Sequence, residues 1–165
     1  MNNKVIRLVT KNSEKIAIAS VALNDSAIQL EIIPMSCLEI QSKDASEIAI
    51  FSVKDAFDAI KQPVVKIDTG FYIEALNGFP GPYTSYVEET LDATDILQLM
   101  KGKSNRRAYY KEVMAYYDGT HEPAIFEAYT YGTISEELSG NQGWNFDRFF
   151  IIDGEQDTIA NFCEL

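Results

Sequence analysis

The sequence predicts one α/β domain over residues 1–165, built from a mixed β-sheet with flanking helices. Two observations support this fold class. Short segments rich in β-branched residues, which favour strands, are separated by segments with helical apolar periodicity and polar residues at their starts. With 165 residues, of which 46% are apolar, the chain is also long enough to bury one sizeable core.

Strands and helices are expected to alternate in the first half of the chain. A strand over 64–67 follows Pro63, and a helix over 46–61 begins at Asp44 or Ser46, either of which offers an N-cap side chain. The apolar residues expected on the buried face of this helix are Ile48, Phe51, Ala56, Phe57 and Ile60. The other elements predicted here are strands over 5–10 and 28–33 and a helix over 14–23.

The second half is expected to begin with short helices and to end in strands. Helices are predicted over 83–91 and 94–100, and two antiparallel strands over 106–117 and 124–135. Several tyrosines fall within these two strands. We expect them to cover a face of the sheet, and a stacking platform for bases is the alternative.

The charge balance excludes some classes of partner. With 25 acidic and 14 basic residues, the formal net charge is −11, so neither nucleic acid nor a membrane surface is an expected partner. A nucleotide is compatible with this charge, because a metal ion and a few local bases can invert the field within one cleft. The two cysteines indicate no disulfide framework. No apolar run reaches transmembrane length and the first residues lack a signal-peptide core, so a cytoplasmic protein is expected.

The most informative stretch is residues 66–83, K-I-D-T-G-F-Y-I-E-A-L-N-G-F-P-G-P-Y. Asp68 is expected where the preceding strand ends, directly before Thr69 and Gly70, and the glycines and prolines near Phe79 predict tight turns. A carboxylate at a strand end beside a glycine-rich turn can present charge to a ligand. The alternative is a surface aspartate that closes a strand.

From Asp68 to Tyr83 the sequence resembles the signature of the inosine/xanthosine triphosphate pyrophosphatases. This family hydrolyses non-canonical purine nucleoside triphosphates to the monophosphate and pyrophosphate. The resemblance implies a twisted mixed sheet with two lobes around a central cleft. It also implies a purine nucleoside triphosphate such as ITP, dITP or XTP as substrate, Mg²⁺ as cofactor, and a homodimer.

The resemblance also implies roles for residues elsewhere in the chain. Thr10, Asn12 and Lys15 match the family pattern T-x-N-x-x-K, a strand-to-helix turn that holds the triphosphate. Glu39 in L-E-I-Q matches a metal-binding glutamate, and Asp68 would be a metal ligand or the catalytic base. The alternatives are a capped surface helix with a solvated lysine and a solvated glutamate in a loop.

A segment near the C-terminus, G-W-N-F-D-R-F-F over residues 143–150, resembles the part of the family that contacts the base. Phe146 matches an aromatic residue that lies against the purine, and Asp147 matches an aspartate that helps to position the base. Core aromatic residues beside a loop acid are the alternative interpretation.

The chain departs from the family pattern at several positions. Ile67 stands where the family has an acid, and Ser52 and Ser85 stand where it has phosphate-binding bases. A lysine and an S-H-R motif that follow in the family are absent from this sequence. Basic residues considered as replacements are Lys54, Lys101, Lys103 and Arg148. Three hypotheses follow: an active nucleoside triphosphate pyrophosphatase, a catalytically impaired nucleotide-binding relative, and a protein-interaction module on the same scaffold.

Overall fold

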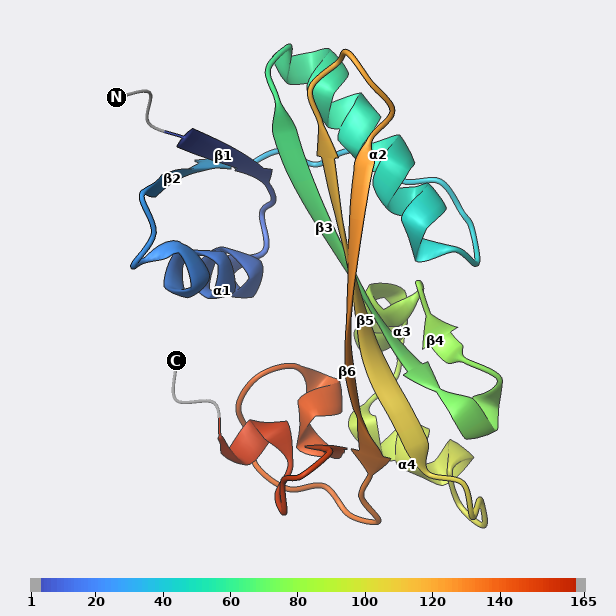
Figure 1. Ribbon diagram of the computed structural model, residues 1–165. Coiled ribbons are helices and arrows are strands. Elements are labelled where there is room, and N and C mark those ends of the chain that lie inside the picture. Colours follow the sequence, from blue (N-terminus) through green and yellow to red (C-terminus); the bar gives the residue numbers. More distant parts are fainter. Residues whose placement is uncertain (1–3, 163–165) are drawn as a thin grey trace. The chain divides into compact units, whose positions relative to one another are not determined.

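The computed structural model describes residues 4–162 as a mixed α/β fold (Figure 1). Its sheet has seven strands, in the order β2-β1-β3-β5-β6-β7 with β4 paired to β3. Within the described residues, four α-helices and three short 3-10 helices accompany this sheet. The predicted fold class, a mixed sheet with flanking helices, is confirmed. None of the helices described is both long and apolar enough to cross a membrane.

The element bounds follow the predicted ones closely. The strands are β1 (Lys4–Val9), β2 (Ile28–Ile33), β3 (Val64–Ile73), β4 (Phe79–Gly81), β5 (Arg107–Tyr117), β6 (Ala124–Ile134) and β7 (Phe150–Ile152). The α-helices are α1 (Ser13–Leu23), α2 (Ala45–Ile60), α3 (Thr84–Thr90) and α4 (Ala93–Leu99), and the 3-10 helices are Glu74–Leu76, Asn145–Arg148 and Ile159–Asn161. The short strands β4 and β7 were not predicted, and β3 is longer than predicted.

The chain divides into two compact units, which are described separately below. Unit 1 contains residues 1–68 and 112–127, and unit 2 contains residues 69–111 and 128–165. The boundaries fall within β3, β5 and β6, so each of these strands contributes residues to both units.

Unit 1 is built around the parallel strands β2, β1 and β3. Strand β1 pairs with β2 along its whole length and with β3 at Leu8 and Val65. The chain passes from β1 through α1 to β2 on one side of β1, and then through α2 to β3 on the other side. The strand order therefore reverses at β1, and in open α/β sheets ligands bind beyond the carboxyl ends of the strands at such a point.

Helix α2 buries one face against the core of unit 1, and four of the five predicted residues, Ile48, Ala56, Phe57 and Ile60, are buried in it or packed against it. Asp44 is the N-cap, and its side chain accepts a hydrogen bond from the Ser46 amide at 2.9 Å. Phe51 was expected on the buried face but is 41% exposed. With 3.6 residues per turn, it lies roughly 130° from the centre of the buried stripe. The buried residues of α2 are Ala45, Ile48, Ala49, Ser52, Val53 and Ala56.

Strand β3 does not end at Asp68 but continues to Ile73, so the predicted strand end was wrong. The β-branched and aromatic residues after Asp68 favour an extended backbone, and Gly70 allows β4 to approach closely. A Cβ atom at Gly70 would lie 2.8 Å from the carbonyl oxygen of Gly81 in β4. Asp68 is therefore a residue in the middle of a strand.

Unit 2 has a core of packed aromatic rings. The ring of Phe71 lies 4.7 Å from that of Tyr110, 5.2 Å from that of Phe146 and 5.2 Å from that of Phe150, measured between centroids. Such tilted and edge-on contacts add to the free energy gained by burying the rings. Apolar residues of α3 and α4, including Ile96, complete this cluster.

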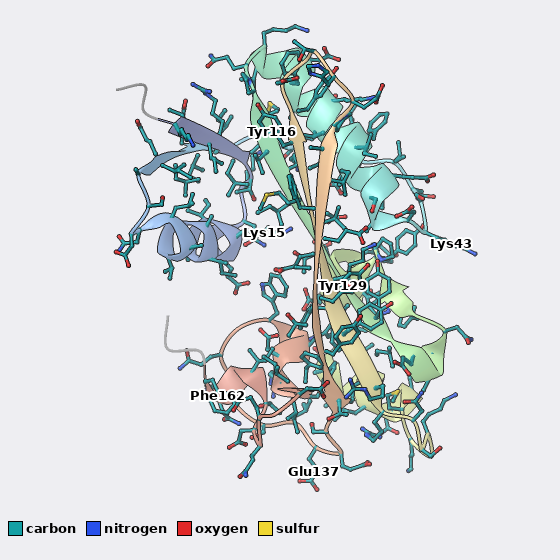
Figure 2. All side chains as sticks on the ribbon, viewed as in Figure 1. Lys15, Lys43, Tyr116, Tyr129, Glu137 and Phe162 are labelled. Carbon is teal, nitrogen blue, oxygen red and sulfur yellow. The ribbon has the colours of Figure 1, made fainter. Side chains whose placement is uncertain are left out.

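A group of tyrosines in unit 2 forms a second aromatic layer along β5 and β6, where Tyr129 is labelled in Figure 2. The ring of Tyr109 stacks on that of Tyr72, with centroids 5.0 Å apart and planes 2° apart. It also contacts the rings of Tyr129 and Tyr131, which are stacked on each other. These contacts agree with the expectation that the tyrosines cover a face of the sheet.

Candidate active site

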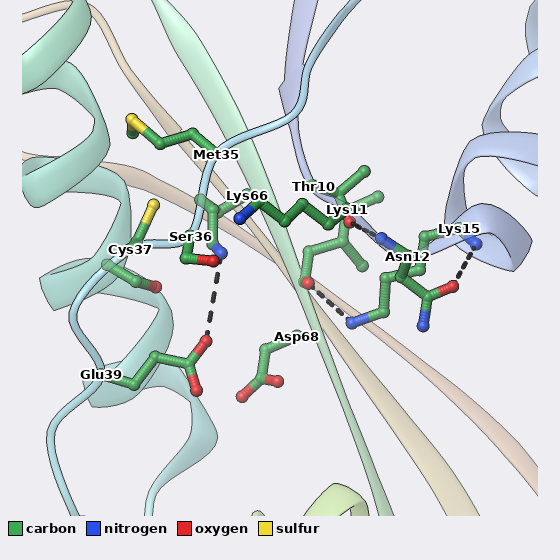
Figure 3. Close-up of a pocket in the computed structure, with 12 residues that line it drawn as sticks. Thr10, Lys11, Asn12, Lys15, Met35, Ser36, Cys37, Glu39, Lys66 and Asp68 are labelled. Atoms are coloured by element: carbon green, nitrogen blue, oxygen red, sulfur yellow. Dashed lines mark hydrogen bonds and ion pairs between the residues drawn. The ribbon is translucent and has the colours of Figure 1, made fainter.

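Unit 1 contains a pocket of about 370 Å³ beyond the carboxyl end of β1 (Figure 3). Its size falls within the range of small-molecule sites in proteins. The residues that line it come from the turn before α1, the first turn of α1, the loop after β2, helix α2 and strand β3. They are Thr10, Lys11, Asn12, Lys15, Met35, Ser36, Cys37, Glu39, Ser52, Lys66, Ile67 and Asp68.

The turn between β1 and α1 is fixed by hydrogen bonds between neighbouring residues. The Thr10 hydroxyl accepts a hydrogen bond from the Asn12 amide at 3.1 Å. The side-chain oxygen of Asn12 accepts hydrogen bonds from the amides of Glu14 at 2.9 Å and Lys15 at 3.0 Å, which makes Asn12 the N-cap of α1. This capping places Lys15 in the first turn of the helix.

Lys15 reaches from α1 to the backbone of β3. Its ammonium group donates a hydrogen bond to the carbonyl oxygen of Ile67 at 2.9 Å. Burial lowers the pKa of Lys15 below its ordinary value, and the Lys66 ammonium acts in the same direction, whereas the carboxylates of Asp68 and Glu39 oppose them. An anion in the pocket would stabilise the charged form of this lysine.

Glu39 lies in the loop between β2 and α2, which is tied to the helix. The amide of Leu38 donates a hydrogen bond to the carboxylate of Asp55 at 2.9 Å, and this contact holds the loop against α2. In Figure 3, Glu39 and Asp68 turn their carboxylates toward each other. Two acids from separate parts of the chain therefore meet in one pocket.

Lys66 stands beside these acids. It lies two residues before Asp68 on β3, so the two side chains leave the same face of the strand. The ammonium nitrogen of Lys66 is 4.0 Å from a carboxylate oxygen of Glu39, and its side chain is only 13% exposed. A hydrogen bond also joins Lys66 to the thiol of Cys37, whose pKa is raised chiefly by burial.

The acids of this pocket form an incomplete metal site by themselves. Among residues 4–162, no group of three or more histidine, cysteine, aspartate or glutamate side chains is arranged to hold a metal ion. Mg²⁺, however, usually binds through one or two carboxylates together with waters and substrate phosphates. The oxygen donors of Glu39 and Asp68 fit this mode of binding.

Five of the predicted site residues thus line one pocket, whereas two belong to unit 2. Phe146 is completely buried in the aromatic core, against Phe71 and Phe149. Asp147 is 7% exposed, and its carboxylate accepts hydrogen bonds from the Tyr110 hydroxyl at 2.9 Å and from the Trp144 amide at 2.7 Å. Burial raises the pKa of Asp147 above its ordinary value. The contacts of Phe146 and Asp147 with a purine stay predictions.

Lys66 is one of the pocket residues that the motifs missed. The sequence did contain a signal for Lys66. Residues two apart on a strand share a face, and Lys66 lies two residues before Asp68, so both side chains could be expected on the same face. Lys54, considered as a replacement base, is instead paired with Glu122 at 2.8 Å and does not line the pocket. Glu47 in α2 accepts a hydrogen bond from Ser42 at 2.7 Å and does not line the pocket either.

This pocket combines a helix N-terminus with lysines and carboxylates at the point where the order of the parallel strands reverses. Such a combination is typical of α/β proteins that bind phosphorylated ligands. The family model described as Ham1 family matches residues 6–164. The chain belongs to the Ham1 family.

Individual relatives agree with this assignment. A dITP/XTP pyrophosphatase from Hyperthermus butylicus is 36% identical over 161 residues, which cover 97% of this chain and 84% of the relative. One from Korarchaeum cryptofilum is 41% identical over 133 residues, which cover 81% of this chain and 71% of the relative. The resemblance noted from residues 68–83 is confirmed.

Solved structures show the same fold. The Ham1 protein of Staphylococcus aureus matches with a TM-score of 0.80 and 25% identity, covering 98% of this chain and 88% of that chain. A HAM1 protein from Coxiella burnetii matches with a TM-score of 0.83 and 24% identity, with the same coverage of 98% and 88%.

Proposed function

We propose that this protein is a nucleoside triphosphate pyrophosphatase that acts on non-canonical purine nucleoside triphosphates such as dITP, ITP and XTP. One observation carries the proposal: Thr10, Asn12, Lys15, Glu39 and Asp68, which were predicted from separate motifs, line a single pocket. The names of the relatives, dITP/XTP pyrophosphatase, support the choice of substrate.

The turn before α1 is the proposed triphosphate site. The positive end of the α1 dipole favours an anion there, although the amides of Glu14 and Lys15 are bonded to the Asn12 side chain. Lys15 would neutralise part of the phosphate charge, because its ammonium lies in the pocket that this turn lines. Charge-assisted hydrogen bonds of this kind are roughly twice as strong as neutral ones.

The two acids are proposed to carry the chemistry. Mg²⁺ held by Glu39 and Asp68 would offset phosphate charge and polarise the phosphoryl group. As the base, which is the alternative to its role as a metal ligand, the Asp68 carboxylate would orient a water molecule and accept its proton as the water oxygen bonds to the α-phosphorus. The bond from the α-phosphorus to the bridging oxygen breaks, and pyrophosphate leaves while the nucleoside monophosphate remains.

Three further features belong to the proposal as expectations. Phe146 and Asp147 would contribute to the contacts with the base, as the family resemblance implies. A homodimer is expected, which sedimentation measured over a range of protein concentrations would test. A cytoplasmic location is expected too, and fractionation of cells that express the protein would test it.

Pyrophosphate release tests the proposed function. Purified protein with Mg²⁺ is assayed on ITP, XTP, dITP and the four ordinary triphosphates, beside Asp68→Ala and a control, Asp58→Ala, which removes a carboxylate that is paired with Lys61 outside the pocket. We expect the wild type and Asp58→Ala to release pyrophosphate from the non-canonical purine triphosphates, and Asp68→Ala to release none. Saturable binding without turnover would favour the catalytically impaired relative, and neither binding nor turnover would favour an interaction module.

A further inference from the structure

The pocket differs in charge from the rest of the protein. The chain carries a formal net charge of −11, yet the residues lining the pocket include three lysines and only two acids. The lysines are Lys11, Lys15 and Lys66, and the acids are Glu39 and Asp68. A local excess of positive charge in an acidic protein indicates an anionic ligand.

One wall of the pocket lacks the base that the family resemblance implies there. Ser52 on α2 lines the pocket, but it is 2% exposed and its hydroxyl donates to the carbonyl oxygen of Ile48 at 3.0 Å. Its hydrogen-bonding proton is therefore used within its own helix. Strand β3 instead supplies an ammonium group to the same pocket through Lys66.

We propose that Lys66 is a second phosphate-binding residue of this pocket, which contacts the triphosphate of the substrate together with Lys15. This inference rests on the proposed function. Under this inference, Lys66 on β3 supplies the positive charge that Ser52 on α2 does not. The pocket can therefore still bind a polyanion, with the basic residue on a different element.

The surroundings of Lys66 favour a ligand over a structural ion pair. Its side chain is 13% exposed, whereas that of Glu39 is 60% exposed, and the 4.0 Å between nitrogen and oxygen exceeds a hydrogen-bond length. The Cys37 thiol lies beside its ammonium group, and thiols are weak hydrogen-bond partners. Hydrogen bonds to phosphate oxygens would stabilise this partly buried ammonium group much more than its contacts with Glu39 and Cys37 do.

The placement of Lys66 also explains how it would reach the same ligand as Lys15. Lys15 bonds to the carbonyl of Ile67, the residue next to Lys66, so both ammonium groups enter the pocket beside one short segment of β3. Two like charges held close together repel each other, and a polyanion between them removes this cost.

Calorimetric binding without added metal tests the proposal. The probes are inorganic pyrophosphate, the non-hydrolysable α,β-imido analogue of dITP, and dIMP, each titrated in EDTA. The variants are Lys66→Met, which keeps the length of the side chain, and Lys66→Arg, which keeps its charge. Lys54→Met is the matched control, because it removes a lysine of the same unit outside the pocket.

Lys66→Met is expected to weaken binding of pyrophosphate and of the imido analogue at least about tenfold, as the loss of a charge-assisted contact implies. Binding of dIMP is expected to change less than about threefold, because it carries fewer phosphates. Lys66→Arg should restore affinity to within about threefold, and Lys54→Met should match the wild type. Equal affinities of Lys66→Met and wild type for the two polyphosphates would overturn the inference.

A purely structural role, in which Lys66 only holds Glu39, predicts a different result. In the Glu39→Gln background, Lys66→Met would then cause no further loss of pyrophosphate affinity, and this would overturn the inference. A further loss of about tenfold would support a direct contact.

If the wild type releases pyrophosphate but Lys66→Met binds normally, only this inference fails. If the wild type neither binds nor hydrolyses triphosphates, the proposed function fails with it.

Discussion

The two units hold the predicted site residues in contrasting surroundings. In unit 1, Lys15, Glu39 and Asp68 line a pocket in which charged groups from different elements meet. In unit 2, Phe146 is completely buried and the carboxylate of Asp147 is used by Tyr110 and by a backbone amide. The five predicted residues of unit 1 therefore line a pocket that is open to a ligand, whereas Phe146 and Asp147 in unit 2 already have packing and hydrogen-bond partners within the protein.

The largest effect is expected from comparing the two aspartates by amide substitution. Asp68→Asn should lower kcat by about 10²–10⁴-fold, because it removes the proposed base or metal ligand. Asp147→Asn should lower kcat by less than about tenfold, because its proposed contact with the base would affect substrate binding more than the chemical step. Pyrophosphate release at saturating dITP measures both. Equal losses in the two variants would break the contrast between the units.

The aromatic core of unit 2 gives the next largest effect. Phe146→Ala should lower the free energy of unfolding by about 3–5 kcal/mol, because it leaves a cavity among fully buried rings. Phe126→Ala removes a ring that is 60% exposed, so it should change stability by less than about 0.5 kcal/mol. Urea unfolding measures both variants. A loss below about 1 kcal/mol for Phe146→Ala would contradict a packing role.

The lysine from α1 should matter for binding more than for folding. Lys15→Met is expected to weaken pyrophosphate binding about 10–100-fold, since a charge-assisted contact contributes about 1.5–3 kcal/mol. Lys43→Met is the control, because Lys43 is exposed and lies outside the pocket in the same unit. Calorimetry without metal measures the two affinities. Unchanged binding in Lys15→Met would remove the turn before α1 from the triphosphate site.

The smallest effect concerns the dependence of stability on pH. The pKa of folded Asp147 is raised above its ordinary value of 3.8, so the folded protein keeps a proton that the unfolded chain has lost. This contribution therefore makes stability fall as pH rises from about 3.8 to the raised value. Asp147→Asn removes this contribution, which unfolding measured from about pH 4 to 7 would show. Parallel pH profiles of wild type and variant would contradict it.

Local signals predicted most of the elements, because their causes lie within a few residues. Either Asp44 or Ser46 was expected to cap a helix, and Asp44 does so through a side-chain hydrogen bond. The strand β2 has the predicted bounds. Helix caps and runs of β-branched residues depend only on residues that are close together in the sequence. Their effects can therefore be predicted from the sequence alone.

Features that depend on distant parts of the chain were harder to predict. The end of β3 was placed at Asp68, because Gly70 suggested a turn, whereas pairing with β4 keeps the strand extended there. Phe51 was expected in the core but lies on the exposed side of α2. Lys66 was missed because no motif contains it, although its register with Asp68 placed both on one face.

Hydrolysis in water enriched in oxygen-18 tests most directly whether the pocket directs water to the α-phosphorus. The wild type is incubated with dITP, the monophosphate and pyrophosphate are separated, and the oxygen-18 content of each is measured by mass spectrometry. The proposed mechanism predicts one labelled oxygen in dIMP and none in pyrophosphate. Label in pyrophosphate, or release of inorganic phosphate in its place, would contradict it.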